Sequence, residues 1–209
     1  LSGYAGVVIG SGQTLTVNLA GTPGEDDGEG AKINNLIGAS GSSLVVNNTG
    51  DGTAVVILNN KEMTTGEDDI DPAGQDTVMG GSITGGSNVA FIKEGTGTLT
   101  VGGTMNMETL TLREGGIVLN GAENSLGTLT LEGGGLTING NAGIGILTAT
   151  EAGGTLTIKG ALDLTGTSSM DYGTITGTGS LRIQEGAELS LSGEARLDGT
   201  AVTANGTLN

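Results

Sequence analysis

The chain has 209 residues, among them 43 Gly, two Tyr, one Phe and no Trp, so any core must be built from small aliphatic side chains. Seven Lys and Arg oppose 23 Asp and Glu, and the net charge of −16 argues against nucleic acid and anionic membranes as partners. The absence of His and Cys excludes a Ser-His-Asp triad, a catalytic Cys–His pair, disulfides and the usual transition-metal ligands.

The first ninety residues contain strand-like segments interrupted by acidic ones. The alternation Leu15-Thr16-Val17 is typical of a half-buried strand. The phrase Gly-Glu-Asp-Asp occurs at 24–27 and again at 66–69. We therefore predict one β-helix domain over 1–209, in which residues 1–90 form irregular coils with acidic loops at about 22–31 and 64–77.

The second acidic loop contains the candidate metal ligands Asp69, Asp71 and Asp76. Calcium prefers several oxygen ligands on a flexible loop, so calcium is the one cofactor that the sequence suggests. The segment matches half of an EF-hand, but Ala73 replaces one ligand and Gly80 stands where the bidentate Glu belongs. A solvated loop between coils is the favoured interpretation, and no other cofactor is expected.

The strongest pattern begins near residue 91 and repeats about every nineteen residues. It relates four pairs of aliphatic residues: Leu110 and Leu129, Ile117 and Leu136, Leu156 and Ile175, and Leu162 and Leu181. Each period contains two short β segments separated by glycine-rich corners, and no helical periodicity is visible. A fixed period of this size indicates stacked units, so residues 91–209 are predicted to form regular coils of a right-handed parallel β-helix.

Two surface patterns follow from the same offset. Glu94, Arg113, Glu132 and Glu151 fall in one column, and Asp163 falls beside Arg182, which predicts ion pairs between neighbouring coils. Threonines also align, with Thr109/Thr111, Thr128/Thr130 and Thr148/Thr150 as one ladder and Thr155/Thr157 with Thr174/Thr176 as another. Outward threonines are ordinary in strands, but a flat threonine array is also what ice-binding β-helices present.

The segment Phe91-Ile92-Lys93-Glu94-Gly95-Thr96-Gly97-Thr98-Leu99-Thr100-Val101, continuing to Gly115-Gly116-Ile117-Val118, resembles the autotransporter-associated β-strand repeat. In that repeat a Lys-x-Gly-x-Gly-x-Leu-x-Leu strand is followed by a Gly-x-Leu strand. The resemblance covers roughly residues 91–140. It implies a right-handed β-helix from the passenger region of a bacterial surface protein. It implies no particular activity, because such repeats are scaffold.

Taken together, these features predict a non-catalytic structural or adhesive module of a bacterial surface or secreted protein, located outside the cell. It would serve as a rod scaffold or an adhesin, with other domains of a longer chain and with glycans or proteins of host or neighbouring cells as partners. No apolar run approaches the ~18 residues of a membrane span, so no membrane insertion of this segment is expected. The alternatives are a carbohydrate-active β-helix enzyme that uses the acidic-loop carboxylates, and an ice-binding protein.

Overall fold

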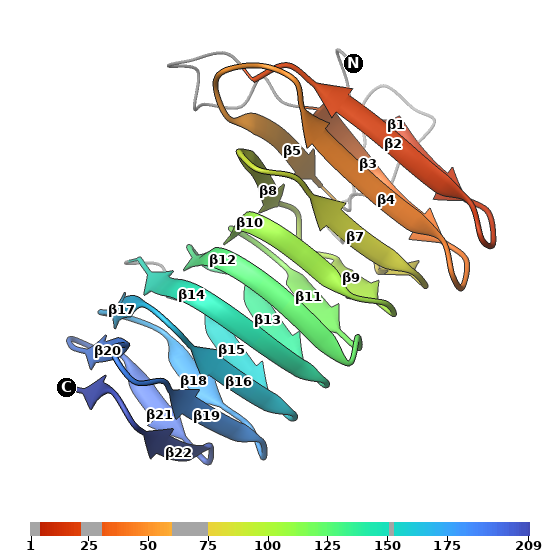
Figure 1. The fold of residues 1–209 in the computed structure, drawn as a ribbon. Helices are drawn as coiled ribbons and strands as arrows, with labels where there is room; N and C mark the ends of the chain where they lie inside the picture. The colour runs from red at the N-terminus through yellow and green to blue at the C-terminus, as the bar shows by residue number, and fades with distance from the viewer. Residues whose placement is uncertain (1–4, 22–30, 60–74, 151–152) are drawn as a thin grey trace, which may run out of the picture.

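The computed structural model describes residues 5–21, 31–59, 75–150 and 153–209. All regular elements within these ranges are β-strands, and every pairing between them is parallel. The chain winds from the N terminus to the C terminus as a stack of coils, drawn from red to blue in Figure 1. The predicted fold, a right-handed parallel β-helix, is confirmed.

The strands stack into three faces. Face 1 contains the ends of β1 (Ala5–Ile9) and β3 (Ala31–Gly38), then β6 (Thr77–Met79), β9 (Thr98–Val101), β11 (Gly116–Leu119), β13 (Gly135–Ile138), β15 (Thr155–Ile158), β18 (Thr174–Thr176) and β21 (Arg196–Asp198).

Face 2 contains β2 (Thr14–Leu19), β4 (Ser43–Asn48) and β7 (Ser82–Gly85), then the starts of β10 (Met105–Leu112), β12 (Glu123–Leu131) and β14 (Asn141–Ala149), and finally β16 (Ala161–Leu164), β19 (Ser180–Ile183) and β22 (Ala201–Ala204). Face 3 contains the starts of β1 and β3, β5 (Ala54–Leu58), β8 (Val89–Lys93), the ends of β10, β12 and β14, and then β17 (Thr167–Met170), β20 (Glu188–Leu191) and β23 (Thr207–Leu208).

The nineteen-residue repeat is the spacing between paired strands. All four predicted pairs are direct neighbours in adjacent coils, including Leu110 with Leu129 and Leu162 with Leu181. About six turns of about 20 residues each make up this regular part. Nearer the N terminus more chain separates neighbours, since Leu15 pairs with Leu44 and Leu44 pairs with Ile83.

The core is a thin column of aliphatic side chains that runs through the middle of the stack. Alternate residues of each strand point inward, so Leu110, Leu129 and Leu147 lie above one another with no exposed surface. One continuous cluster of buried residues extends from Ile9 to Leu189. Each coil therefore contributes only a few side chains, and its stability depends on the coils on both sides.

A ladder of glycines forms the corner between faces 1 and 2. It consists of Gly103, Gly121, Gly140, Gly160 and Gly179 in successive coils. A Cβ atom at Gly140 would lie 2.0 Å from the carbonyl oxygen of Gly121, and one at Gly160 would lie 1.7 Å from the oxygen of Gly140. The backbones of neighbouring coils thus approach so closely at this corner that only glycine fits.

Lys93 is the one ionisable side chain among the buried residues that the structure describes. It occupies an inward position of β8, paired with Leu58 on one side and Leu112 on the other. Its Nζ donates hydrogen bonds to the carbonyl oxygens of Glu94 at 2.7 Å and Gly95 at 2.6 Å. Burial lowers the pKa of Lys93 to about 8, although the carboxylates of Glu114, Asp76 and Glu94 act in the opposite direction.

This burial predicts an unusual dependence of stability on pH. The pKa of Lys93 is about 8 in the folded chain and 10.5 in the unfolded chain, so the unfolded state binds more protons between these values. The free energy of unfolding should therefore rise between pH 8 and pH 10.5, by about 2–3 kcal/mol. Urea titrations at pH 7.5 and pH 10.5 measure this rise. In the Lys93→Met variant the rise should vanish, and an equal rise in both proteins would contradict the assignment to Lys93.

Candidate functional site

The acidic loops that the sequence singled out lie mostly outside the described residues, and Asp69 and Asp71 lie there entirely. At their described ends, Ala31 belongs to β3 and Thr77 belongs to β6. Asp76 is described, and its Oδ1 accepts a hydrogen bond of 2.7 Å from the backbone N–H of Thr98 in the next coil. Within the described ranges no three Asp or Glu residues lie close enough to hold a metal ion. The calcium site at Asp69, Asp71 and Asp76 stays a prediction.

The predicted charge column is formed as ion pairs between coils. Arg113 lies between two carboxylates, with Nη1 2.8 Å from Glu94 Oε1 and Nε 2.9 Å from Glu132 Oε2. The hydrogen bond to Glu94 is the largest of the effects that raise the pKa of Arg113. Arg182 binds Asp163 through two bonds of 2.8 and 3.3 Å. Glu151 lies outside the described residues. Since these pairs are exposed, each contributes only about 0.2–1 kcal/mol.

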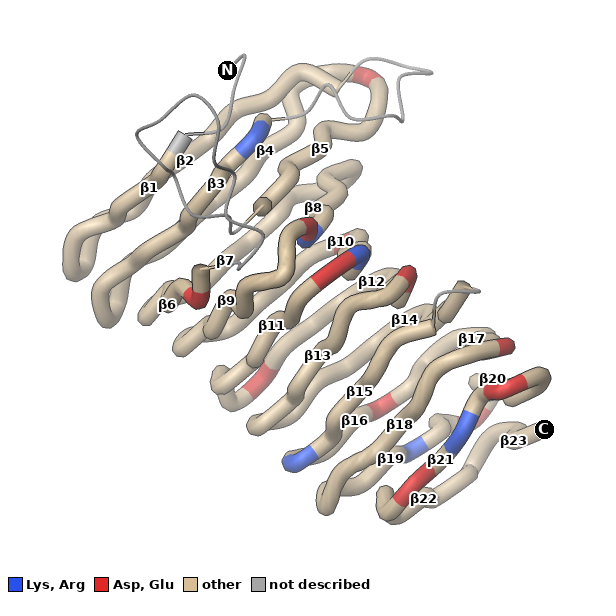
Figure 2. Tube along the Cα trace, turned by 180° about the vertical axis from the view of Figure 1, so that it is seen from behind, with Lys and Arg blue, Asp and Glu red and all other residues tan. Residues whose placement is uncertain are grey.

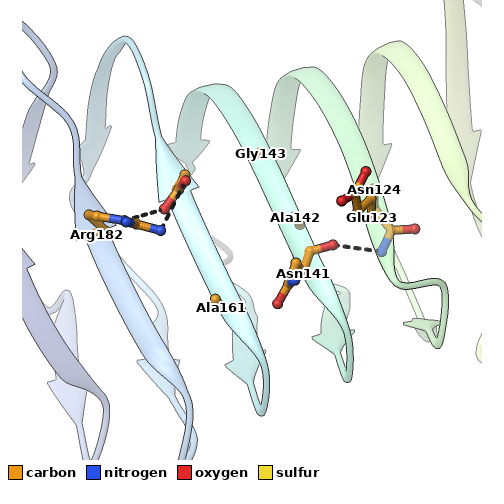
Figure 3. Close-up of a pocket in the computed structure, with 8 residues that line it drawn as sticks. Glu123, Asn124, Asn141, Ala142, Gly143, Ala161 and Arg182 are labelled. Carbon is orange, nitrogen blue, oxygen red and sulfur yellow. Dashed lines mark hydrogen bonds and ion pairs between the residues drawn. The ribbon is translucent and has the colours of Figure 1, made fainter.

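A shallow hollow lies on the outer surface of face 2 (Figure 3). Glu123 stands at one side of it, and the Asp163–Arg182 pair stands at the other. Asn141 lies between them in the pairing order Glu123, Asn141, Ala161. The floor is open because Gly143 has no side chain, and a Cβ added there would meet no atom within 4 Å.

The hollow can accept hydrogen bonds from hydroxyl or amine groups, because the carboxylate of Glu123 has no hydrogen bond or ion pair among the described residues. Beneath Glu123, the buried Asn124 is fully occupied: its Oδ1 accepts from Met105 N, and its Nδ2 donates to the carbonyl oxygens of Gly121 and Asn141. Sequence reasoning missed this hollow. Glu123 and Asp163 are far apart in the chain, and only the offset between Asp163 and Arg182 hinted at it.

Tyr172 is the only aromatic residue with exposed surface in the described part of the chain, since Phe91 is fully buried. It lies at the corner between β17 and β18, and it lines two shallow hollows. Asp171 belongs to one of them and Glu194 to the other. The side chain of Asp171 accepts a hydrogen bond from Ser192 Oγ. The sequence left Tyr172 without a role, and the structure places it at the surface without enclosing it.

The threonine ladders form with one correction. Thr109 pairs with Thr128 and Thr111 with Thr130, as predicted, and Thr155 and Thr157 pair with Thr174 and Thr176. The third rung of the first ladder was wrong, because Thr128 pairs with Ile146 and Thr130 pairs with Thr148. The step between β12 and β14 is one residue shorter than the repeat, and this displaces the register.

A longer outward column runs along face 1. It contains only β-branched side chains over eight successive levels: Val8, Ile37, Val78, Thr100, Val118, Thr137, Thr157 and Thr176. Strands β9, β11, β13, β15 and β18 of this face contain no charged residue. Figure 2 views the molecule from this side, and the red and blue segments along this stretch lie at the corners of the coils or behind the face, on β16 and β19. We call this surface the uncharged face.

Among the described residues, Arg113 and Arg182 are paired with carboxylates of neighbouring coils, and the three hollows are open at the surface. No helix that could cross a membrane occurs in the described ranges. Neither a family model, nor a curated protein, nor a solved structure matches this chain.

Proposed function

We propose that the chain is a rod-shaped structural and adhesive module of a bacterial surface or secreted protein. In this proposal it lies outside the cell and is not a catalyst. The observation that supports this most directly is the continuous stacking of coils from β1 to β23. Such a stack holds its two ends apart and offers long surfaces instead of an enclosed pocket. The resemblance of residues 91–140 to autotransporter-associated repeats points the same way.

Adherence of coated beads tests this proposal. Beads that carry the folded chain are expected to adhere to bacterial cells or to epithelial monolayers. Matched beads should carry the Leu129→Asp variant, which has nearly the same composition but in which several adjacent coils are expected to be unfolded. Adherence should fall by at least about tenfold with the variant, because extended surfaces exist only in the folded rod. Equal adherence of the two bead types would reject an adhesive function of the fold.

The enzyme alternative gains nothing from the described carboxylates. Glu123 and Asp163 flank an open hollow, but Asp163 is already bound by Arg182, and no second free carboxylate lines it. We expect no release of reducing ends from polysaccharides incubated with the chain. Cleavage by the wild-type chain that is lost in a Glu123→Gln variant would overturn the non-catalytic proposal. It would identify the hollow beside Glu123 as an active site.

The ice-binding alternative draws support from one observation, the uncharged face, which is longer than the ladders that the sequence suggested. The column beside it is interrupted, however, because Gly116 and Gly135 stand between Thr98 and Thr155. An interrupted array presents hydroxyl groups at only some levels. Thermal hysteresis of the intact chain separates this alternative from an adhesive rod.

A further inference from the structure

The uncharged face exposes apolar surface that most of the rod does not. Val8, Ile37 and Val78 are 79%, 45% and 54% exposed, and they are three of the five large hydrophobic residues that stand out as exposed among the described residues. They are consecutive members of one column, followed by half-buried Thr100 and Val118. A contiguous apolar strip on a soluble protein marks a contact surface more often than scattered apolar residues do.

The distribution of charge singles out the same surface. The chain carries a net charge of −16, yet five successive strands of face 1 are free of charged residues. Asp76 lies just before β6, and Arg196 and Asp198 lie in β21, so charges resume only outside this central stretch. Two such faces could approach each other without burying a charge, which would be costly without a partner.

We propose that the uncharged face packs against the same face of a second copy of this chain, as two sheets related by a two-fold axis. Because the central strands of this face contain no charged residue, two copies can bring it together about a two-fold axis without opposing like charges. Sheets that stack in this way pack about 10 Å apart, with their strands within about 30° of each other. Thr100 and Val118 are the fourth and fifth of the eight levels and would lie at the centre of the contact.

The size of the strip sets the strength of this contact. Eight levels spaced ~4.8 Å apart span ~34 Å, and three residues across a strand span ~10 Å, so the strip covers roughly 350 Å². A stable pair needs about 800 Å² from each partner. A single pair is therefore weak, and association becomes effective only where many rods stand side by side, as on the cell surface of the proposed function, on which this inference rests.

Salt should strengthen this association. The charged residues that the structure describes lie outside the central strands of the contact, and the charge of the chain is mostly of one sign, so two copies repel each other at a distance. The screening length falls from about 10 Å at 0.1 M salt to about 3 Å at 1 M, while the apolar contact itself is not screened. This direction is opposite to that of an interface held by ion pairs between the copies.

Sedimentation of the intact chain at 0.1 M and 1 M NaCl tests the proposal. The dissociation constant of the dimer is expected to fall at least about tenfold at the higher salt concentration. Val118→Lys should abolish association at both, because it places a charge at the centre of the contact. The matched control is Thr130→Lys, an outward and half-buried position on face 3 of the next coil, which should associate like wild type. Thermal melts verify that both variants fold.

Three outcomes would overturn the proposal. They are a wild-type chain that stays monomeric at millimolar concentration in 1 M NaCl, association that weakens with salt, and a Val118→Lys variant that associates normally. If the wild-type chain stayed monomeric and showed thermal hysteresis that Val118→Lys lacked, the uncharged face would be an ice-binding surface instead. Adherence of beads carrying folded Val118→Lys keeps the two proposals apart, since retained adherence would leave the adhesive rod standing without self-association.

Discussion

Replacing Leu129 by aspartate is expected to unfold several adjacent coils. Leu129 has no exposed surface, and it lies between Leu110 and Leu147 in the inward column of face 3. Lys93, the one buried cation among the described residues, lies in β8, two coils away and in the neighbouring inward column. The new carboxylate would therefore be buried without an ion-pair partner, at a cost of about 3–5 kcal/mol or more. Because each coil contributes only a few core residues, this cost exceeds the stabilising free energy that one coil contributes.

Urea denaturation followed by far-ultraviolet circular dichroism measures this loss. The control is Thr130→Asp, which introduces the same group at the adjacent outward position. Thr130 shares a hydrogen bond of 3.2 Å with Thr148, so this control should lose only about 1 kcal/mol. If Leu129→Asp unfolded at the same urea concentration as wild type, the register that places Leu129 in the core would be wrong.

Replacing Gly140 by valine should be the second most damaging change among those considered, with a loss of more than about 3 kcal/mol. The new Cβ would lie 2.0 Å from the carbonyl oxygen of Gly121. That atom belongs to the backbone of the neighbouring coil, so relief requires the coils themselves to separate. The separation would break the pairing between β12 and β14 close to this corner, where Asn141 N donates to Ala122 O at 3.1 Å.

Gly143 provides the matched comparison on the same strand. A Cβ at Gly143 meets no atom within 4 Å, and valine suits an outward strand position. Gly143→Val should therefore melt at or slightly above the wild-type temperature, with an effect of about 0.5–1 kcal/mol. Equal melting temperatures for the Gly140 and Gly143 variants would show that the corner tolerates side chains. Because Gly143 forms the floor of the hollow beside Glu123, the same variant also fills that hollow without loss of the fold.

The charged side chains of the rod affect its stability differently at the surface and in the core. The ion pairs of Arg113 and Arg182 link neighbouring coils, but they are exposed and add little to stability. Lys93 is the opposite case, since it is fully buried and its charge opposes folding below pH 8. The uncharged face is neither core nor ion-pair surface. For that reason it is the part of the rod on which a partner is proposed.

The amino-acid sequence by itself determined the repeating unit of this protein. The alternation of Leu, Thr and Val identified strands, and the nineteen-residue offset paired Leu110 with Leu129 and Asp163 with Arg182, as the structure confirms. This worked because inward positions in a parallel stack require aliphatic residues in every coil, so the register leaves a visible trace in the sequence. The same reasoning failed at Thr148/Thr150, where one residue is lost between β12 and β14.

Only the tertiary structure decided what the coils bring together. The column from Val8 to Thr176 crosses levels of unequal spacing, and the first of them carry Val and Ile where later ones carry Thr. No fixed offset reveals such a column. Burial of Lys93 was equally hidden, because a lysine at the end of a strand normally extends its ammonium group to solvent. The composition and the repeat period predict which residues recur in every coil. Which residues share a face, and which charge is buried, depends on how coils of different length are stacked.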